Sequence, residues 1–291
     1  MVRRGARGEN DLRNYECPPL ARLFKALVRL NNISYIITNT QTRPPAAGER
    51  RTHYDRYTQH QHPLHPHRIR GTTVLDTIGL VISGIDDTLL STMNISTKYH
   101  TLGLFSSRTG AAGQITAIDD AVKATNTEVL SIEFPRDTKG WGGHGNYIVI
   151  GGNDVSDVRH AIELALELTK KNAGELYISD SGHLEFTFSA SAGAALQKAF
   201  HAVPGQAFGF MAGSPAAIGL VMADTAMKAS AVNIACYMTP SIGTSHSNEV
   251  ILGISGDASA VKAAVLEARQ VGLELLIGMG SYPEIPGTPY L

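Results

Sequence analysis

The sequence predicts an α+β fold made of two tandem copies of one domain, with helices packed on a mostly antiparallel sheet in each copy. Segment 119–125 (Asp-Asp-Ala-Val-Lys-Ala-Thr) returns as segment 224–230 (Asp-Thr-Ala-Met-Lys-Ala-Ser). Matching positions stay about 105 residues apart, an interval too long for a solenoid repeat and long enough for a small domain. Two β-rich segments in each copy also follow one another without a helix between them, which favours antiparallel pairing.

Three regions are expected along the chain: an N-terminal extension over 1–71, a first domain over 72–179 and a second over 180–291. The extension carries 13 Lys and Arg against 5 Asp and Glu, whereas the remainder carries 12 against 21. No apolar run reaches the roughly 18–20 residues of a membrane span. Because the N-terminus also lacks a signal-peptide pattern, we predict a cytoplasmic protein.

Most of the extension is predicted to be disordered. Residues 31–71 are rich in Arg, His, Gln, Pro and Thr and show no sustained apolar period. Four histidines in this segment have no rigid scaffold, so we expect no metal site from them: His60, His62, His65 and His67.

A short basic amphipathic helix is expected over 20–30, before that segment. Its apolar face consists of Leu20, Leu23, Phe24, Leu27 and Leu30. Such a helix could dock in a groove of a partner, lie on a membrane surface, or be a nascent helix in the extension.

Each copy is expected to open with a strand, a short helix and a second strand. The positions are 78–85, 86–93 and 101–106 in the first copy, and 184–189, 192–200 and 207–212 in the second.

Two longer helices follow in each copy. The first has an apolar stripe on one face and Asp119 and Lys123 on its exposed side. Asp224 and Lys228 are their counterparts in the second copy, and the spacing of four residues predicts a weak surface ion pair in each helix. The second helix has an i, i+3, i+4, i+7 stripe whose small residues let it lie close to a sheet: Val158, Ala161, Ile162 and Ala165, with counterparts Val261, Ala264, Val265 and Ala268.

The paired strands are expected at 128–134 and 146–151, and again at 232–238 and 248–254. The loops between them, 135–145 and 239–247, are the segments where the copies diverge most.

These loops hold the candidate pore or ligand residues, because they are polar and Gly-rich and occur once per copy. If copies were arranged in a ring, such loops could line an opening. The candidates are Arg136, Asp137, Thr138, Lys139, Gly140, Trp141, His144, Ser241, Gly243, Thr244, Ser245 and His246.

Catalytic and metal-binding interpretations of the same loops are weaker. The Gly-rich loop lacks the Gly-Lys-Ser/Thr order of a P-loop and leads to a strand, so nucleotide binding is not expected. A Ser245, His246 and Asp137 set has no nucleophile-elbow sequence around it. His144 and His246 are expected to be polar loop residues, with pore lining as the functional alternative, and no cofactor is implied.

The two cysteines, Cys17 and Cys236, have no metal-ligand spacing. Cys236 lies in an expected strand and is predicted to be buried and reduced.

Segments 223–232 and 254–264 resemble the bacterial microcompartment (BMC) shell domain. The first is Ala-Asp-Thr-Ala-Met-Lys-Ala-Ser-Ala-Val, and the second, after a Gly/Ser loop, is Ile-Ser-Gly-Asp-Ala-Ser-Ala-Val-Lys-Ala-Ala. A looser copy occupies 119–129 and 151–161. A strand and short helix precede each copy where the simple family has them at the end, which is typical of the circularly permuted tandem-domain type.

Three segments make the chain most similar to the propanediol-utilisation shell protein B subfamily: 76–82, 121–129 and 135–140. The resemblance extends over about residues 72–291. It implies a homotrimer whose six lobes form a flat pseudo-hexagonal tile, packed against other shell proteins around the enzymes of a metabolosome.

The resemblance also implies a structural protein without catalytic activity, with pores for small polar metabolites and with Lys123 and Lys228 at tile edges. Helix 20–30 is then a candidate contact for encapsulated enzymes, and neither nucleic acid nor membrane is an expected partner. The alternative is a small-molecule binding or sensory protein with a ligand site between its two domains, and an enzyme ranks third.

Overall fold

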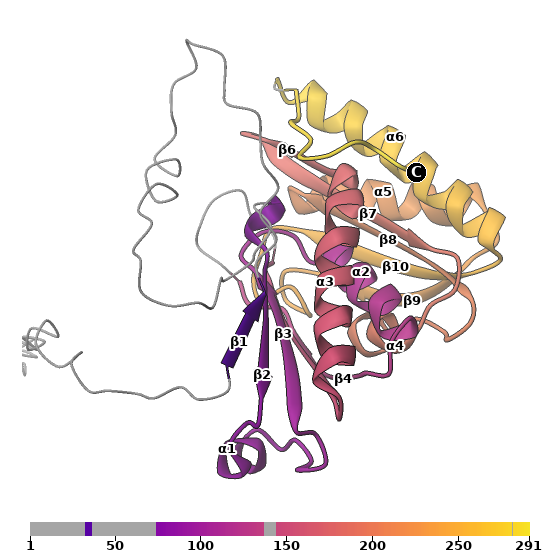
Figure 1. Ribbon diagram of the computed structural model, residues 1–291. Helices are drawn as coiled ribbons and strands as arrows, with labels where there is room; N and C mark the ends of the chain where they lie inside the picture. The colour runs from indigo at the N-terminus through magenta and orange to yellow at the C-terminus, as the bar shows by residue number, and fades with distance from the viewer. Residues whose placement is uncertain (1–32, 37–73, 137–143, 281) are drawn as a thin grey trace, which may run out of the picture. The chain divides into compact units, whose positions relative to one another are not determined.

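The computed structural model describes residues 33–36, 74–136, 144–280 and 282–291 (Figure 1). The described residues from Ile33 onward belong to one compact unit. Its described strands form two five-stranded sheets, ordered β1-β2-β3-β5-β4 and β6-β7-β8-β10-β9. Every strand pairing in both sheets is antiparallel, which confirms the predicted α+β class and the tandem repeat.

The first lobe is built on the first sheet. It contains β1 (Ile33–Ile36), the 3-10 turn η2 (Val74–Asp76), β2 (Ile78–Ser83), α1 (Asp87–Thr92), β3 (Thr101–Ser107), α2 (Ala112–Lys123), β4 (Glu128–Glu133), β5 (Asn146–Gly152) and α3 (Val155–Asn172).

The second lobe repeats the order of strands and α-helices on the second sheet, but its 3-10 turn precedes the edge strand. It contains the 3-10 turn η3 (Ala173–Glu175), β6 (Leu176–Ser179), β7 (Gly182–Ser189), α4 (Ala194–Phe200), β8 (Ala207–Ser214), α5 (Ala216–Ala229), β9 (Asn233–Met238), β10 (Val250–Gly256) and α6 (Ala258–Gly278).

Two edge strands differ from the sequence expectation. Strand β6 pairs with β7 of the second sheet, whereas the boundary expected after residue 179 places it in the first domain. Strand β1 lies within segment 31–71, for which no strand was expected, and it pairs with β2 as β6 pairs with β7. The repeat therefore includes one more strand per lobe than the sequence pattern indicated. Helix 20–30 and the four clustered histidines lie outside the described residues.

The long helices α3 and α6 begin at matching capping residues. Asp154 accepts a hydrogen bond from the backbone N–H of Ser156 at 2.8 Å, and Asp257 accepts one from that of Ser259 at 2.9 Å. Each carboxylate satisfies an N–H that has no partner within the helix. The predicted apolar stripes of both helices are fully buried, as expected of helices that cover a sheet.

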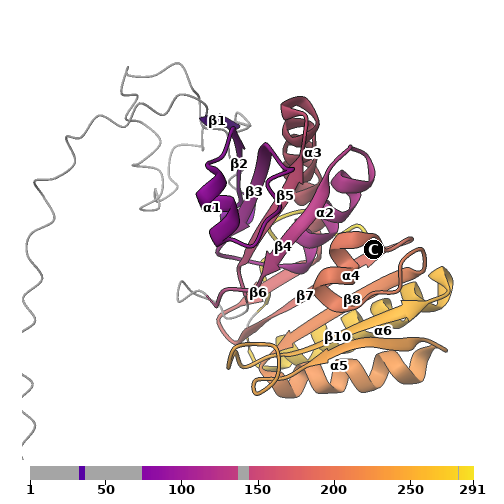
Figure 2. The ribbon, with the colours of Figure 1, turned by 90° about the horizontal axis from the view of Figure 1, so that it is seen from below.

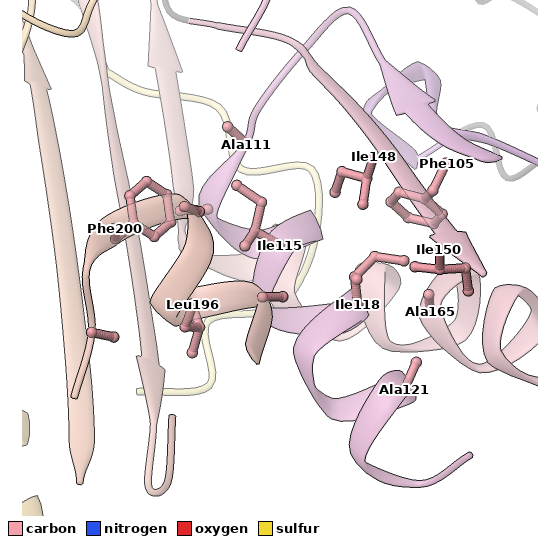
Figure 3. Packing of buried hydrophobic residues seen from close by; sticks show 14 of the residues in the cluster. Phe105, Ala111, Ile115, Ile118, Ala121, Ile148, Ile150, Ala165, Leu196 and Phe200 are labelled. Atoms are coloured by element: carbon pink, nitrogen blue, oxygen red, sulfur yellow. The ribbon is translucent and has the colours of Figure 1, made fainter. Parts of the chain in front are cut away.

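The lobes share one apolar core. Phe105 and Ile118 of the first lobe belong to the same buried cluster as Leu196 and Phe200 of α4 in the second. Figure 3 shows Leu196 and Phe200 on α4, beside the helix α2 that carries Ile115. In Figure 2, α2 and α4 lie side by side where the lobes meet, and α5 and α6 pack together in the second lobe. Each large buried side chain contributes roughly 1.5–3 kcal/mol, so the shared cluster holds the two lobes together strongly.

Within the described part of the chain, no helix is both long enough and apolar enough to cross a membrane. Cys236 is buried and is not in a disulfide, as expected. Burial raises the pKa of its thiol to about 11, which keeps it in the unreactive protonated form.

Candidate functional site

Residues Asp137, Thr138, Lys139, Gly140 and Trp141 lie outside the described residues. Arg136 is exposed and forms an isolated antiparallel bridge with His144. The two residues that flank the undescribed segment therefore lie next to each other.

The second loop is folded back on itself. The Thr244 hydroxyl donates to the carbonyl of Thr239 at 2.9 Å, and the backbone N–H of His246 donates to the carbonyl of Pro240 at 3.0 Å. Thr244 is buried by this arrangement. The other candidates of this loop are exposed: Ser241, Gly243, Ser245 and His246. The loop therefore presents small polar groups and one imidazole to solvent from an internally bonded scaffold.

His144 lies apart from these exposed residues. Its side chain is buried at the junction of the lobes, with Nδ1 2.6 Å from Oε1 of Glu249. The other oxygen of that carboxylate is 3.1 Å from Nε2 of His183 on β7. One histidine from the first lobe and one from the second therefore share a single buried carboxylate.

The charges in this set stabilise one another. Burial opposes ionisation of Glu249, but hydrogen bonds from His144 and His183 outweigh it and lower the Glu249 pKa to about 2. Burial likewise favours neutral His144, yet the hydrogen bond and charge of Glu249 prevail and raise the His144 pKa above 6.5. The Glu249 carboxylate and the His144 imidazolium therefore favour each other's charged forms across the junction of the lobes.

A second contact between the lobes caps α2. The Glu185 carboxylate on β7 accepts hydrogen bonds from the backbone N–H groups of Ala111, Ala112 and Gly113, at 3.1, 2.9 and 3.3 Å. Burial raises the pKa of Glu185, while the bonds from Ala111 and Gly113 act in the opposite direction. A carboxylate at this place complements the positive end of the helix dipole.

The reverse contact caps α4. The Asp119 carboxylate on α2 accepts from the backbone N–H groups of Gly193 at 2.9 Å, Ala195 at 2.9 Å and Leu196 at 3.1 Å. It also lies 2.8 Å from Nζ of Lys123. The prediction of a weak exposed pair is therefore wrong for Asp119, which is fully buried because the second lobe covers this face of α2.

The matching pair in the second lobe is exposed as predicted. Asp224 and Lys228 form a 2.6 Å ion pair, and their side chains are 58% and 74% exposed. By contrast, Lys123 also donates to the carbonyl of Ser191 in the second lobe, at 2.5 Å. The two candidate edge lysines therefore have different environments within one chain.

Sequence reasoning did not identify Glu185, Glu249 or His183. A signal was present on β7, where polar His183, Glu185 and Thr187 alternate with apolar residues. Alternation of this kind is typical of a strand with one solvated face, and here the polar face is covered by the other lobe.

The cavity between the lobes is small. Phe134, His144, Glu185, Phe200 and Glu249 are among the residues that line a space of about 10 Å³, roughly what one water molecule needs. The described residues also contain no group of three His, Cys, Asp or Glu side chains placed to hold a metal ion. The junction has the properties of a structural contact.

Comparison with known proteins gives a consistent result. The BMC domain family matches residues 101–180 and 207–283. A bacterial microcompartment shell protein PduB from Citrobacter freundii is 49% identical over 221 residues, which cover 76% of this chain and 82% of that protein.

Two solved structures have a similar fold. The crystal structure of a trimeric bacterial microcompartment shell protein PduB gives a TM-score of 0.74 at 45% identity, covering 76% of this chain and 97% of that one. EtuB from Clostridium kluyveri gives a TM-score of 0.74 at 44% identity, with the same two coverages.

Proposed function

This chain belongs to the BMC-domain family of bacterial microcompartment shell proteins, and from that premise we propose that it is a structural shell protein. Three copies form a pseudo-hexagonal tile with pores for small polar metabolites. The tile packs beside other shell proteins in a microcompartment of the bacterial cytoplasm.

The directional contact between the two lobes is the observation that carries this proposal. The first lobe contributes α2, and the second contributes a different surface made by α4 and β7. A contact between unlike surfaces closes into a ring when it is repeated with a suitable rotation. Because the lobes are copies of one domain, three chains supply six ring positions.

The loops between β4 and β5 and between β9 and β10 are proposed as the pore-lining segments. Support comes from the exposed small polar residues of the second loop, whose backbone and hydroxyl groups suit uncharged polar solutes. A pore must release what it admits, so its affinity for such solutes has to be weak. Isothermal titration with a small diol should therefore give millimolar or undetectable affinity.

A ligand-binding or sensory role would require a site between the lobes. The space there is about 10 Å³, far below the roughly 300 Å³ of a small-molecule pocket. Micromolar diol affinity in the same titration would favour that alternative over a pore.

Lys228 is the better supported of the two proposed edge lysines. Its ammonium group is bonded to Asp224 and remains largely exposed, whereas that of Lys123 is bonded to three groups within the chain. We assign lateral contact between tiles to Lys228. Segment 20–30, outside the described residues, is proposed as the contact for encapsulated enzymes, and no catalytic step is assigned to the chain.

Electron microscopy of the assembled protein at low salt tests the shell role. The wild type should form extended sheets or tubes, and Lys228→Ala should reduce them while leaving the trimer intact. Lys262→Ala is the matched control, because it removes an exposed lysine from α6 that has no assigned contact. Sheets that are unchanged in Lys228→Ala would remove the edge assignment, and a wild type that never assembles would argue against the tile.

A further inference from the structure

Exposed apolar side chains gather on α5 and β9 of the second lobe. Leu220 and Val221 on α5 are 54% and 44% exposed, and Ile234 and Tyr237 on β9 are 55% and 43% exposed. Large apolar side chains that cluster in this way mark a surface that another molecule covers.

The repeat identifies what this surface corresponds to in the first lobe. The 119–125 and 224–230 match places Leu220 at the position of Ile115 and Val221 at that of Thr116. Both first-lobe residues are buried, at 0% and 3% exposure.

The sheet registers give the matching positions on the edge strands. Ile234 pairs with Ile254 as Val129 pairs with Ile150. Tyr237 pairs with Leu252 as Ile132 pairs with Ile148. Val129 and Ile132 pack against the shared core, whereas Ile234 and Tyr237 are open to solvent.

The second lobe supplies the cover in the first case. Leu196 of α4 belongs to the same buried cluster as Ile115, and the Thr187 hydroxyl on β7 lies 3.0 Å from that of Thr116. Helix α4 also contacts β4. The α2 and β4 face of the first lobe is thus covered by the α4 and β7 face of the second.

The first lobe has its own version of that covering face, and it is open. Gly103 pairs with Val81 as Gly209 pairs with Phe188, which sets β2 and β7 in register. The helices that follow begin at matching points, since α1 starts at Asp87 and α4 at Ala194.

In this register Leu89 of α1 corresponds to Leu196, and Ile78 of β2 corresponds to Glu185. Leu89 is 49% exposed and Ile78 is 38% exposed. Both halves of a contact like that between the lobes are therefore present on one chain, and neither half has a partner among the described residues.

We propose that the α5 and β9 face of one chain docks on the α1 and β2 face of a second copy of this chain. This seam repeats the geometry of the contact within the chain but not its chemistry. The inference rests on the proposed trimeric tile and specifies which residues hold it together.

The two seams differ at the matched polar positions on the strands and helices. The hydroxyl pair of Thr116 and Thr187 becomes Val221 and Leu80. The capping carboxylate Glu185 becomes Ile78. At the helix end that it would face, the backbone N–H of Ala216, the counterpart of Ala111, already donates to Oδ1 of Asn248 at 3.1 Å.

The replacements are mutually consistent, because a buried carboxylate without donors would be costly and an isoleucine there is not. The contact within a chain is bonded through the Glu185 cap, whereas the matching position between chains is apolar. If the α4 and β7 face docked on an α5 and β9 face instead, Glu185 would be buried without its N–H donors.

Cross-linking of engineered cysteines tests the seam in the full-length protein. The variant carries Leu80→Cys and Val221→Cys in a Cys17→Ser background. The native Cys236 thiol stays in place because it is buried. Each single-cysteine variant serves as a background, and Thr116→Cys with Thr187→Cys is the matched pair within a chain.

Treatment with a short bismaleimide should convert the Leu80 and Val221 pair into covalent dimers and trimers on a denaturing gel, with the series ending at three chains. In the variant with Thr116→Cys and Thr187→Cys, the reagent should consume both thiols without joining two chains, so the protein should still run as a single chain. A wild type that is trimeric by light scattering, but whose Leu80 and Val221 pair links no chains, would overturn this seam and leave the tile standing. A monomeric wild type would overturn the tile itself.

A second variant measures the energetic importance of the same seam. Leu220→Asp puts a charge in the apolar contact and should raise the concentration for half dissociation at least tenfold, with the circular dichroism of the folded lobes retained. Met279→Asp is the control, since Met279 is 50% exposed at the end of α6. Equal effects of the two substitutions would contradict the seam.

Discussion

The carboxylate of Glu185 in the second lobe lies 2.9 Å from the backbone nitrogen of Ala112, the first residue of α2 in the first lobe. Asp119 on the same helix returns the contact to the N-terminal end of α4. Each lobe thus completes the hydrogen bonding of a helix in the other. The two copies of the repeat are therefore parts of one folding unit, although each has its own sheet.

Glu185→Gln should lower the free energy of unfolding by about 1–3 kcal/mol, because a neutral amide is a weaker partner for three N–H groups and adds donors that need acceptors. Chemical denaturation at fixed protein concentration measures the change. The exposed Glu167→Gln on α3 is the control and should stay within about 0.5 kcal/mol of the wild type. A loss no larger than that of the control would show that the cap is not energetically important.

Asp119→Ala should cost about 1–2 kcal/mol, the usual range for losing a helix N-cap. It leaves the N–H groups of Gly193, Ala195 and Leu196 without their acceptor. Asp120→Ala removes a neighbouring carboxylate that pairs with Lys123 from the exposed side, and it should have little effect on the denaturation midpoint. Equal midpoints for the two variants would contradict the cap assigned to Asp119.

The pH dependence of stability should reflect the His144, Glu249 and His183 set. The Glu249 pKa falls from 4.5 to about 2 on folding, so its contribution is present above 4.5 and is lost as the pH falls towards 2. The His144 pKa rises above 6.5, so its contribution is present below 6.5 and is lost as the pH rises through the folded value. Both contributions are complete between pH 4.5 and 6.5.

Thermal melting of wild type and Glu249→Gln across this range isolates the set. The difference in melting temperature should be greatest between pH 4.5 and 6.5 and should shrink on either side. Removing one partner of a buried charged contact typically costs about 3–5 kcal/mol. A difference that is constant with pH would mean that the set is not ionised in the folded protein.

Gly219→Ala on α5 should destabilise the second lobe by about 1–3 kcal/mol through overpacking. A Cβ there would lie 2.7 Å from the carbonyl oxygens of Gly213 and Val250, and backbone atoms cannot easily move away. Gly278→Ala, near the end of α6, meets nothing within 4 Å and should stabilise by about 0.5–1 kcal/mol. Unfolding midpoints that move in the same direction for both would contradict the close packing of α5 on β8.

Most of the secondary structure could be predicted because it follows from local patterns. The stripes of α3 and α6 and the strands around the two diverged loops were expected within a few residues of their observed bounds. Strands β1 and β6 were missed because each has four residues and pairs at a sheet edge. Segments of that length carry too little periodicity to separate them from loops.

The contacts between the lobes could not be predicted for a different reason. Asp119 and Asp224 occupy the same position in the repeat, and helix spacing assigned both to a solvated face. Their environments differ because the second lobe covers Asp119, a fact determined by residues more than 70 positions away. The family resemblance predicted the tile. Only the structure identified the carboxylates that hold the two lobes of one chain together.

The molar mass of the purified protein, measured by light scattering over a range of concentrations, tests the proposed trimeric shell tile most directly. The expected result is a mass three times that of one chain, maintained on dilution to micromolar concentrations. A mass equal to one chain at every concentration would contradict the tile, because a single pair of lobes cannot close a ring.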